Sequence, residues 1–96
     1  MDYEIDKILL SPLLSQAIIS SSDISKSIAN FIKRYRQLDF GDISEVAYKL
    51  NLINAINKNL TVGVYPLIND FIVIFTITSN KKRITSCLFL QEFLDK

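Results

Sequence analysis

The hydrophobic residues of this 96-residue chain change their spacing at Thr61. Before Thr61 they recur every three or four residues, which is the period of one helix face; after it they recur every second residue, which is the period of a strand. Three later segments are rich in β-branched and aromatic residues: Thr61–Tyr65, Phe71–Thr78 and Arg83–Leu90. Because only short breaks separate these segments, we expect hairpins and therefore antiparallel strands. The chain is predicted to be α+β.

Two helices are predicted before the strands. Ser22 or Asp23 is suited to begin the first helix, and Gly41 follows its end. Ser44 is suited to begin the second helix, which ends near Lys58. Each helix carries one apolar stripe, which we expect to pack against the sheet. The first stripe consists of Ile24, Ile28, Phe31, Ile32, Tyr35 and Leu38, and the second consists of Val46, Leu50, Ile53 and Ile56.

The central strand decides which face of the sheet the helices are expected to cover. Its odd-numbered residues are all apolar, whereas its even-numbered residues are half apolar and half threonine. We therefore expect the helices on the odd-numbered face, which carries Phe71, Val73, Phe75 and Ile77. The other face would expose an apolar patch made of Ile72, Ile74 and Phe89.

The two ends of the chain add short elements. Ile5–Leu10 is apolar and is followed by Pro12, which favours a strand. Leu13–Ile19 is predicted to form one or two helical turns, with Ser11 as the cap, and Gln91–Lys96 at most one turn. The chain is 49% hydrophobic and 22% charged, which argues against disorder. We expect one domain over residues 1–96, with two main helices packed on one face of an antiparallel sheet of three to four strands.

The composition removes most common catalytic and metal-binding arrangements, since the chain has no His and one Cys. Cys87 lies in an apolar run and is expected in the core. Asp39, Asp42 and Glu45 bracket the loop between the helices, and we interpret them as caps and turn residues. We expect no enzyme activity, no metal and no other cofactor.

The sequence contains no stretch typical of a signal peptide or a membrane-spanning helix. The start of the chain is acidic, and Pro66 interrupts the longest apolar stretch, Leu60–Ile77. These features favour a cytoplasmic protein that does not enter a membrane. Ile, Lys and Asn, all with AT-rich codons, number 15, 8 and 7, which indicates an AT-rich bacterial or phage genome.

Two basic clusters are the candidate binding residues: Lys33, Arg34 and Arg36 at the end of the first helix, and Lys81, Lys82 and Arg83 between the last two strands. Each cluster also has a structural interpretation. Cations complement the dipole at the carboxyl end of a helix, and charged turns protect edge strands from aggregation. The net charge is only +1, so no overall field attracts nucleic acid. Clusters on one shared face would favour phosphate binding.

Short motifs occur along the chain in one order: Asp39-Phe40-Gly41-Asp42-Ile43, Asn51, Val64-Tyr65, Ile77-Thr78, Thr85-Ser86 and Glu92-Phe93. Together they resemble a family of small proteins carried by phages, plasmids and other mobile elements. Lys7–Ser11 is similar to the opening strand of that family. The chain departs from the family's Thr-Glu-x-Asp-Arg run, where it has Ser79, Lys81 and Lys82, and from a family Pro, where it has Leu90. Its local charge is therefore basic where that of the family is mixed.

The resemblance implies an accessory protein that interferes with host defence, in the manner of anti-CRISPR proteins. Such a protein binds a CRISPR effector or another defence nuclease complex stoichiometrically and without catalysis. Protein binding through the two basic clusters is therefore the leading hypothesis. The alternative is a nucleic-acid-binding regulator that uses the same clusters. A homodimer formed through the apolar sheet face also stays open.

Overall fold

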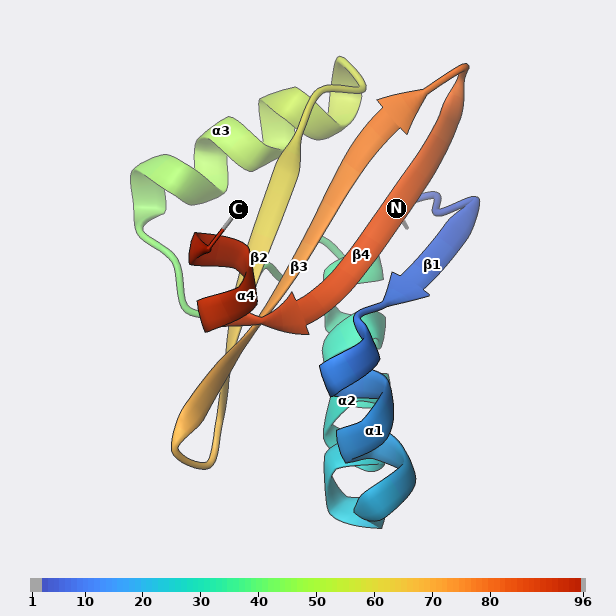
Figure 1. Ribbon diagram of the computed structural model, residues 1–96. Helices are drawn as coiled ribbons and strands as arrows, with labels where there is room; N and C mark the ends of the chain where they lie inside the picture. Colours follow the sequence, from blue (N-terminus) through green and yellow to red (C-terminus); the bar gives the residue numbers. More distant parts are fainter. Residues whose placement is uncertain (1–2, 96) are drawn as a thin grey trace.

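A computed structural model describes residues 3–95, which form four helices and a four-stranded sheet (Figure 1). The strands lie in the order β1-β4-β3-β2. The predicted α+β class is confirmed. In chain order the elements are β1 (Lys7–Leu10), α1 (Pro12–Ser20), α2 (Ser22–Arg36), α3 (Glu45–Ile56), β2 (Thr61–Leu67), β3 (Asp70–Ser79), β4 (Lys82–Phe89) and α4 (Leu90–Leu94).

The sheet is antiparallel through β2, β3 and β4, as the short hairpins require. β1 differs, because it pairs with β4 in parallel, with Lys7 opposite Ile84 and Leu10 opposite Cys87. The sheet is therefore mixed, and the expectation of antiparallel pairing is wrong for this strand. A tight turn forces antiparallel pairing, but most of the chain lies between β1 and β4, so their relative direction is free of that constraint.

Serine side chains begin the three longer helices. Ser11 Oγ accepts the N–H of Leu14 at 3.2 Å, and Ser21 Oγ accepts the N–H of Ile24 at 3.3 Å. Ser44 Oγ accepts the N–H of Ala47 at 3.1 Å. Each bond satisfies a donor that the first helical turn leaves unpaired. The cap of α2 is therefore Ser21, one residue before the expected position.

The helices cover the face of the sheet that was expected to be open. Ile72, Ile74 and Thr76 are buried beneath α2, whereas Phe71 and Ile77 on the opposite face are partly exposed. Figure 1 shows α2 behind the sheet and the short α4 in front of it. The predicted orientation of β3 is therefore wrong, and Ile72 and Ile74 form no surface patch. We call the face that carries α4 the open face.

A buried set of hydroxyl groups explains why a half-polar face packs against the helices. Tyr35 Oη lies 2.6 Å from Thr61 Oγ1 and 2.6 Å from Thr76 Oγ1. The Thr76 hydroxyl lies 2.7 Å from that of Thr85, and Thr61 Oγ1 donates to Tyr3 Oη at 3.1 Å. Because these hydroxyls satisfy one another, burying them costs little. Burial also raises the pKa of Tyr35.

Helix α3 is also turned the opposite way from the expected orientation. Val46 and Ile56 are 78% and 75% exposed, and Leu50 and Ile53 are each more than half exposed. The side that faces the protein carries Asn51 and Ala55, both buried. At about 100° per residue, Val46, Leu50 and Ile53 lie on the side of the helix opposite to Asn51 and Ala55. The predicted packing of this stripe against the sheet is wrong.

The orientation of α3 follows from the unpaired edge of β2. Asn51 Nδ2 donates to Val62 O at 2.7 Å, and Val62 N donates to Asn51 Oδ1 at 3.1 Å. Asn54 Nδ2 donates to Leu60 O at 2.9 Å. The Asn51 amide thus presents one donor and one acceptor, as a neighbouring strand would, and satisfies an otherwise orphaned edge. Turning the aliphatic stripe inward would remove these bonds.

The loop between α2 and α3 completes the cover of this edge. Val64 N donates to Phe40 O at 3.0 Å, and Asp42 N donates to Val64 O at 2.7 Å. Gly41 between them has a φ of 78°, and an added Cβ would collide with Val64 O. Gly41, Asp42, Asn51 and Val64, which belong to the motifs of the resemblance, therefore lie together and have a structural role here.

Candidate protein-binding surface

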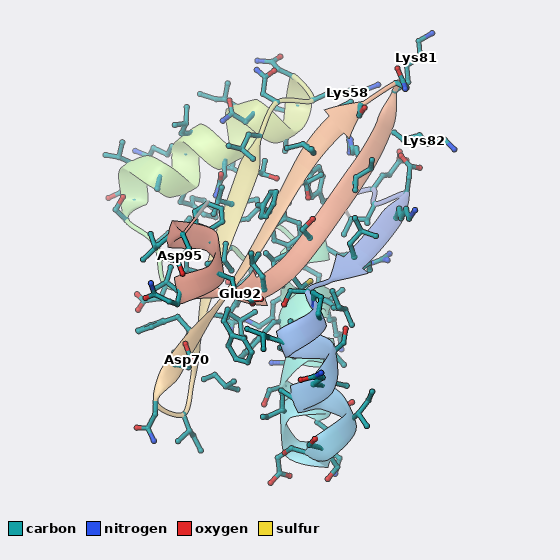
Figure 2. The ribbon with its side chains drawn as sticks, in the orientation of Figure 1. Lys58, Asp70, Lys81, Lys82, Glu92 and Asp95 are labelled. Atoms are coloured by element: carbon teal, nitrogen blue, oxygen red, sulfur yellow. The ribbon has the colours of Figure 1, made fainter. Side chains whose placement is uncertain are left out.

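The basic cluster between β3 and β4 separates into two parts with different surroundings. Asn80 and Lys81 form the turn, with φ values of 50° and 66°, and Ser79 is the register partner of Lys82. Lys81 and Lys82 are exposed at this tip, where Figure 2 shows them pointing away from the sheet. Among residues 3–95 the ion pairs are Arg34–Asp39 and Lys49–Glu45, so neither tip lysine has an acidic partner there.

Arg83, the third member of the cluster, is held by the protein itself. Its guanidinium lies 4.9 Å from the centre of the Tyr3 ring, and Nη1 donates to Glu4 O at 3.4 Å. Its backbone N–H donates to Asp6 Oδ2 at 2.7 Å. These contacts fix Arg83 on the helix-covered side of the sheet. Arg83 is therefore a structural residue rather than a free binding residue.

Arg34 is likewise engaged within the protein. Its Nε donates to Asp39 Oδ2 at 2.8 Å and its Nη2 to Asp39 Oδ1 at 3.3 Å, while the guanidinium lies 5.2 Å from the centre of the Tyr65 ring. The hydrogen bond to Asp39 raises the pKa of Arg34, and the same bond lowers the pKa of Asp39. Asp39 Oδ1 also accepts the N–H of Gly41 at 3.1 Å. The pair thus holds the loop that covers β2.

Lys33 and Arg36 are exposed near the end of α2. The carbonyl oxygen of Arg36 accepts the N–H of Tyr3, and the Tyr3 ring contacts Arg83. Through Tyr3 the two clusters approach each other on the helix-covered side. Lys82, however, has the same strand parity as Ile84 and points to the open face. The free members of the two clusters therefore do not form one patch.

The open face carries an apolar row next to the lysine tip. Lys7 lies opposite Ile84, and Ile84 lies opposite Ile77, so these three side chains share the open face. Leu60 precedes Thr61, the register partner of Thr76, and so lies beside the end of the row. Ile77 is 46% exposed and Leu60 is 48% exposed. The apolar part of the row thus runs from Ile84 on β4 through Ile77 on β3 to Leu60 just before β2, and Lys7 on β1 ends it.

Lysines surround this row. Lys7 lies at one end of it, and Lys81 and Lys82 lie at the adjacent tip. Figure 2 shows Lys58 at the same end of the molecule, while the labelled acidic residues Asp70, Glu92 and Asp95 lie away from it. Asp6, the acidic neighbour, accepts the N–H of Arg83. We call this surface the lysine-rimmed row; it comprises Leu60, Ile77 and Ile84 with Lys7, Lys58, Lys81 and Lys82.

Only part of the lysine-rimmed row was visible in the sequence. Lys81 and Lys82 stand out as neighbouring charges, but Lys7 and Lys58 are isolated along the chain. Ile77 was expected in the core, because the wrong face of β3 was assigned to the helices. The pairing of β1 with β4 brings Lys7 to Ile84, and sequence pattern carries no signal for that register.

The acidic residues of the helix connection do not converge. Asp39 binds Arg34, and Glu45 Oε1 lies 3.3 Å from Lys49 Nζ on the next turn of α3. Across residues 3–95, no group of three or more His, Cys, Asp or Glu side chains is placed to hold a metal ion. Cys87 is fully buried, and burial raises its pKa to about 12, so the thiol stays protonated at neutral pH.

Comparison with protein-family models, with curated proteins and with solved structures gave no match to this chain. None of the helices within residues 3–95 combines the length and apolar character that crossing a bilayer needs.

Proposed function

We propose that this chain acts by binding a protein partner stoichiometrically, without catalysis, through the lysine-rimmed row. The observation that carries the proposal is an exposed apolar strip whose surrounding lysines have no ion pair among residues 3–95. Apolar side chains supply affinity when they are desolvated, and surrounding charges raise the association rate with a surface of opposite sign. The partner's surface is accordingly acidic around an apolar centre.

The surface suits a protein better than a nucleic acid. Arg34 and Arg83, whose planar groups would bind phosphates best, are occupied by internal contacts. The row also offers aliphatic side chains, whereas single-stranded nucleic acids bind on aromatic ones. About four lysines would give phosphate binding that falls steeply as salt rises. Regulation by nucleic-acid binding is therefore the second candidate and becomes an outcome of the test below.

The finer proposal concerns the class of partner. The resemblance to accessory proteins of mobile elements supports a partner in a defence nuclease complex of a bacterial host, such as a CRISPR effector, met in the cytoplasm. The channels of such complexes that hold nucleic acid are positively charged, so the lysine rim would have to meet an acidic surface elsewhere on the complex. The Thr-Glu-x-Asp-Arg run of the family contains both acidic and basic residues. At the same place this chain has Lys81 and Lys82, so this tip would supply the electrostatic attraction to an acidic partner.

The test measures binding to purified CRISPR effector complexes, one system at a time, by surface plasmon resonance. The K81E/K82E double variant should lower the association rate constant about tenfold, because both charges are exposed at the rim. The matched control is K33E/R36E, which changes the net charge equally at exposed positions on α2. It should leave the rate within about twofold, and both variants should keep the wild-type melting temperature within a few degrees.

Two results would contradict the proposal. Loss of binding in K33E/R36E alone would move the site to the end of α2. Tight binding of the wild-type chain to a 20-base-pair DNA duplex, with affinity that falls steeply between 50 and 200 mM salt, would favour the nucleic-acid regulator.

A further inference from the structure

The outward stripe of α3 is an exposed apolar feature that the lysine-rimmed row does not use. It consists of Val46, Leu50, Ile53 and Ile56. Every one of these aliphatic side chains is at least 55% exposed. We propose that two copies of this chain pair through the α3 stripe to form a homodimer.

The spacing of the stripe suits helix pairing. Val46, Leu50 and Ile53 stand at i, i+4 and i+7, which places one aliphatic side chain on each successive turn of a single face. The helix cannot bury this face within its own molecule, because Asn51 on the opposite side is bound to the edge of β2. The stripe therefore stays available on the folded chain.

The stripe is also self-complementary about a two-fold axis. When two α3 helices lie antiparallel with Leu50 near the axis, Val46 of each copy faces Ile53 of the other. Residue contacts of this reciprocal kind define an isologous interface. The charged side chains beside the stripe, Glu45 and Lys49, pair with each other at 3.3 Å within one copy. They therefore bring no net charge, and hence no repulsion, to the dimer.

The exposed area suits a weak dimer. The four aliphatic side chains of the stripe expose roughly 400 Å² of apolar surface per copy, within the range of the largest patch on a typical monomer. Two copies together would bury at most about 800 Å², the size of a weak, transient interface. We therefore expect a dissociation constant on the order of 100 µM. The row and the stripe are different surfaces, so the dimer would carry two lysine-rimmed rows.

A second copy fits the stripe better than a charged partner does. The lysines of the rim would attract an acidic surface to the open face, whereas the stripe lacks net charge. A uniform apolar stripe next to a neutral ion pair is matched by an identical stripe. Binding of the acidic partner at the stripe is the competing outcome, and the experiment below distinguishes it.

The first experiment measures the oligomeric state by sedimentation velocity between about 1 and 500 µM protein. The wild-type chain should shift from monomer to dimer over this range. The I53E variant should raise the dimer dissociation constant at least tenfold, because a carboxylate would be buried against the second stripe. The matched control is I68E at the β2–β3 tip, where Ile68 is 89% exposed and is separated from the end of α3 by the length of β2. I68E and K81E/K82E should both dimerise like the wild type.

A second experiment does not depend on the stability of a charged variant. L50C places a thiol near the proposed two-fold axis, while the native Cys87 is buried and protonated. Mild oxidation should link L50C into a covalent dimer, whereas I68C should stay largely monomeric. A monomeric wild-type chain at 500 µM, or equal cross-linking of L50C and I68C, would overturn the dimer. If I53E instead weakened binding to an effector complex while the wild type stayed monomeric, the stripe would belong to the partner-binding surface.

Discussion

Asn51 gives the sharpest test of how α3 is attached. The side chain is 7% exposed and makes two hydrogen bonds to Val62, at 2.7 and 3.1 Å. Replacing it with alanine leaves one N–H and one C=O of an edge strand without partners. Each unpaired group costs about 1–3 kcal/mol, and partial access of water to Val62 favours the lower half of that range. We therefore predict that N51A lowers the free energy of unfolding by about 2–4 kcal/mol.

The neighbouring asparagines supply a graded control. N54A removes a single bond, to Leu60 O, from a less buried position and should cost about 0.5–1 kcal/mol. Asn57 is exposed, and its side chain makes no hydrogen bond to residues 3–95, so N57A should change stability by less than about 0.5 kcal/mol. Urea melts measure all three values, and amide hydrogen exchange at Val62 should accelerate in N51A.

Equal stability of N51A and N57A would refute this reasoning. It would mean that α3 does not dock through Asn51, and the outward orientation of the stripe would lose its physical cause. N51D gives a complementary reading, since only a protonated carboxyl can donate to Val62 O while it accepts from Val62 N. The stability of N51D should be highest at acidic pH and should fall as the pH rises and the carboxyl ionises.

Three further predictions concern the interior. Y35F leaves the buried hydroxyls of Thr61 and Thr76 short of one partner and should cost about 1–3 kcal/mol in a urea melt. G41A must adopt a positive φ and push Val64 O aside, so its melting temperature should fall by more than that of the exposed control A29G. The pKa of Cys87 is raised to about 12 in the folded state, above its ordinary value of 9.0. The thiol therefore contributes stability that is present below about pH 9 and is lost as the pH rises toward 12, and C87A should show a weaker loss over that window.

The elements themselves could be predicted because their signals are local. The periods of two and of 3.6 residues, together with serine caps, placed the helices and strands within about two residues of where they lie. The predicted strand Phe71–Thr78 corresponds to β3, and the predicted helix from Ser22 corresponds to α2. Such signals depend on neighbouring residues alone, so one sequence contains them.

The orientation of β3 and α3 could not be predicted because it depends on partners far along the chain. Thr76 is suited to the core only when Tyr35 and Thr85 supply its hydrogen bonds. Asn51 is suited to the buried side of α3 only because Val62 is on an unpaired edge. A rule that places apolar residues inside therefore assigns both faces wrongly, since hydrogen bonding decided the packing.

The candidate site was predicted only in part, because it too depends on contacts between residues far apart in the chain. Lys81 and Lys82 could be identified as exposed charges of a turn. Arg34 and Arg83 could not be set aside, because the contacts with Asp39 and Tyr3 depend on the folded arrangement. The apolar centre of the row is created by strand register, which joins Ile77 to Ile84 and Lys7.

The proposed function is tested most directly in bacteria that carry one CRISPR system and are infected with a targeted phage. Expression of the wild-type chain should raise the efficiency of plating of that phage toward the level on a strain without the system. At the lowest expression at which the wild type has this effect, K81E/K82E should reduce it, whereas K33E/R36E, at equal expression and with the same change in net charge, should retain it. Unchanged protection by K81E/K82E, with the protein folded and the wild type active, would contradict binding through the lysine-rimmed row.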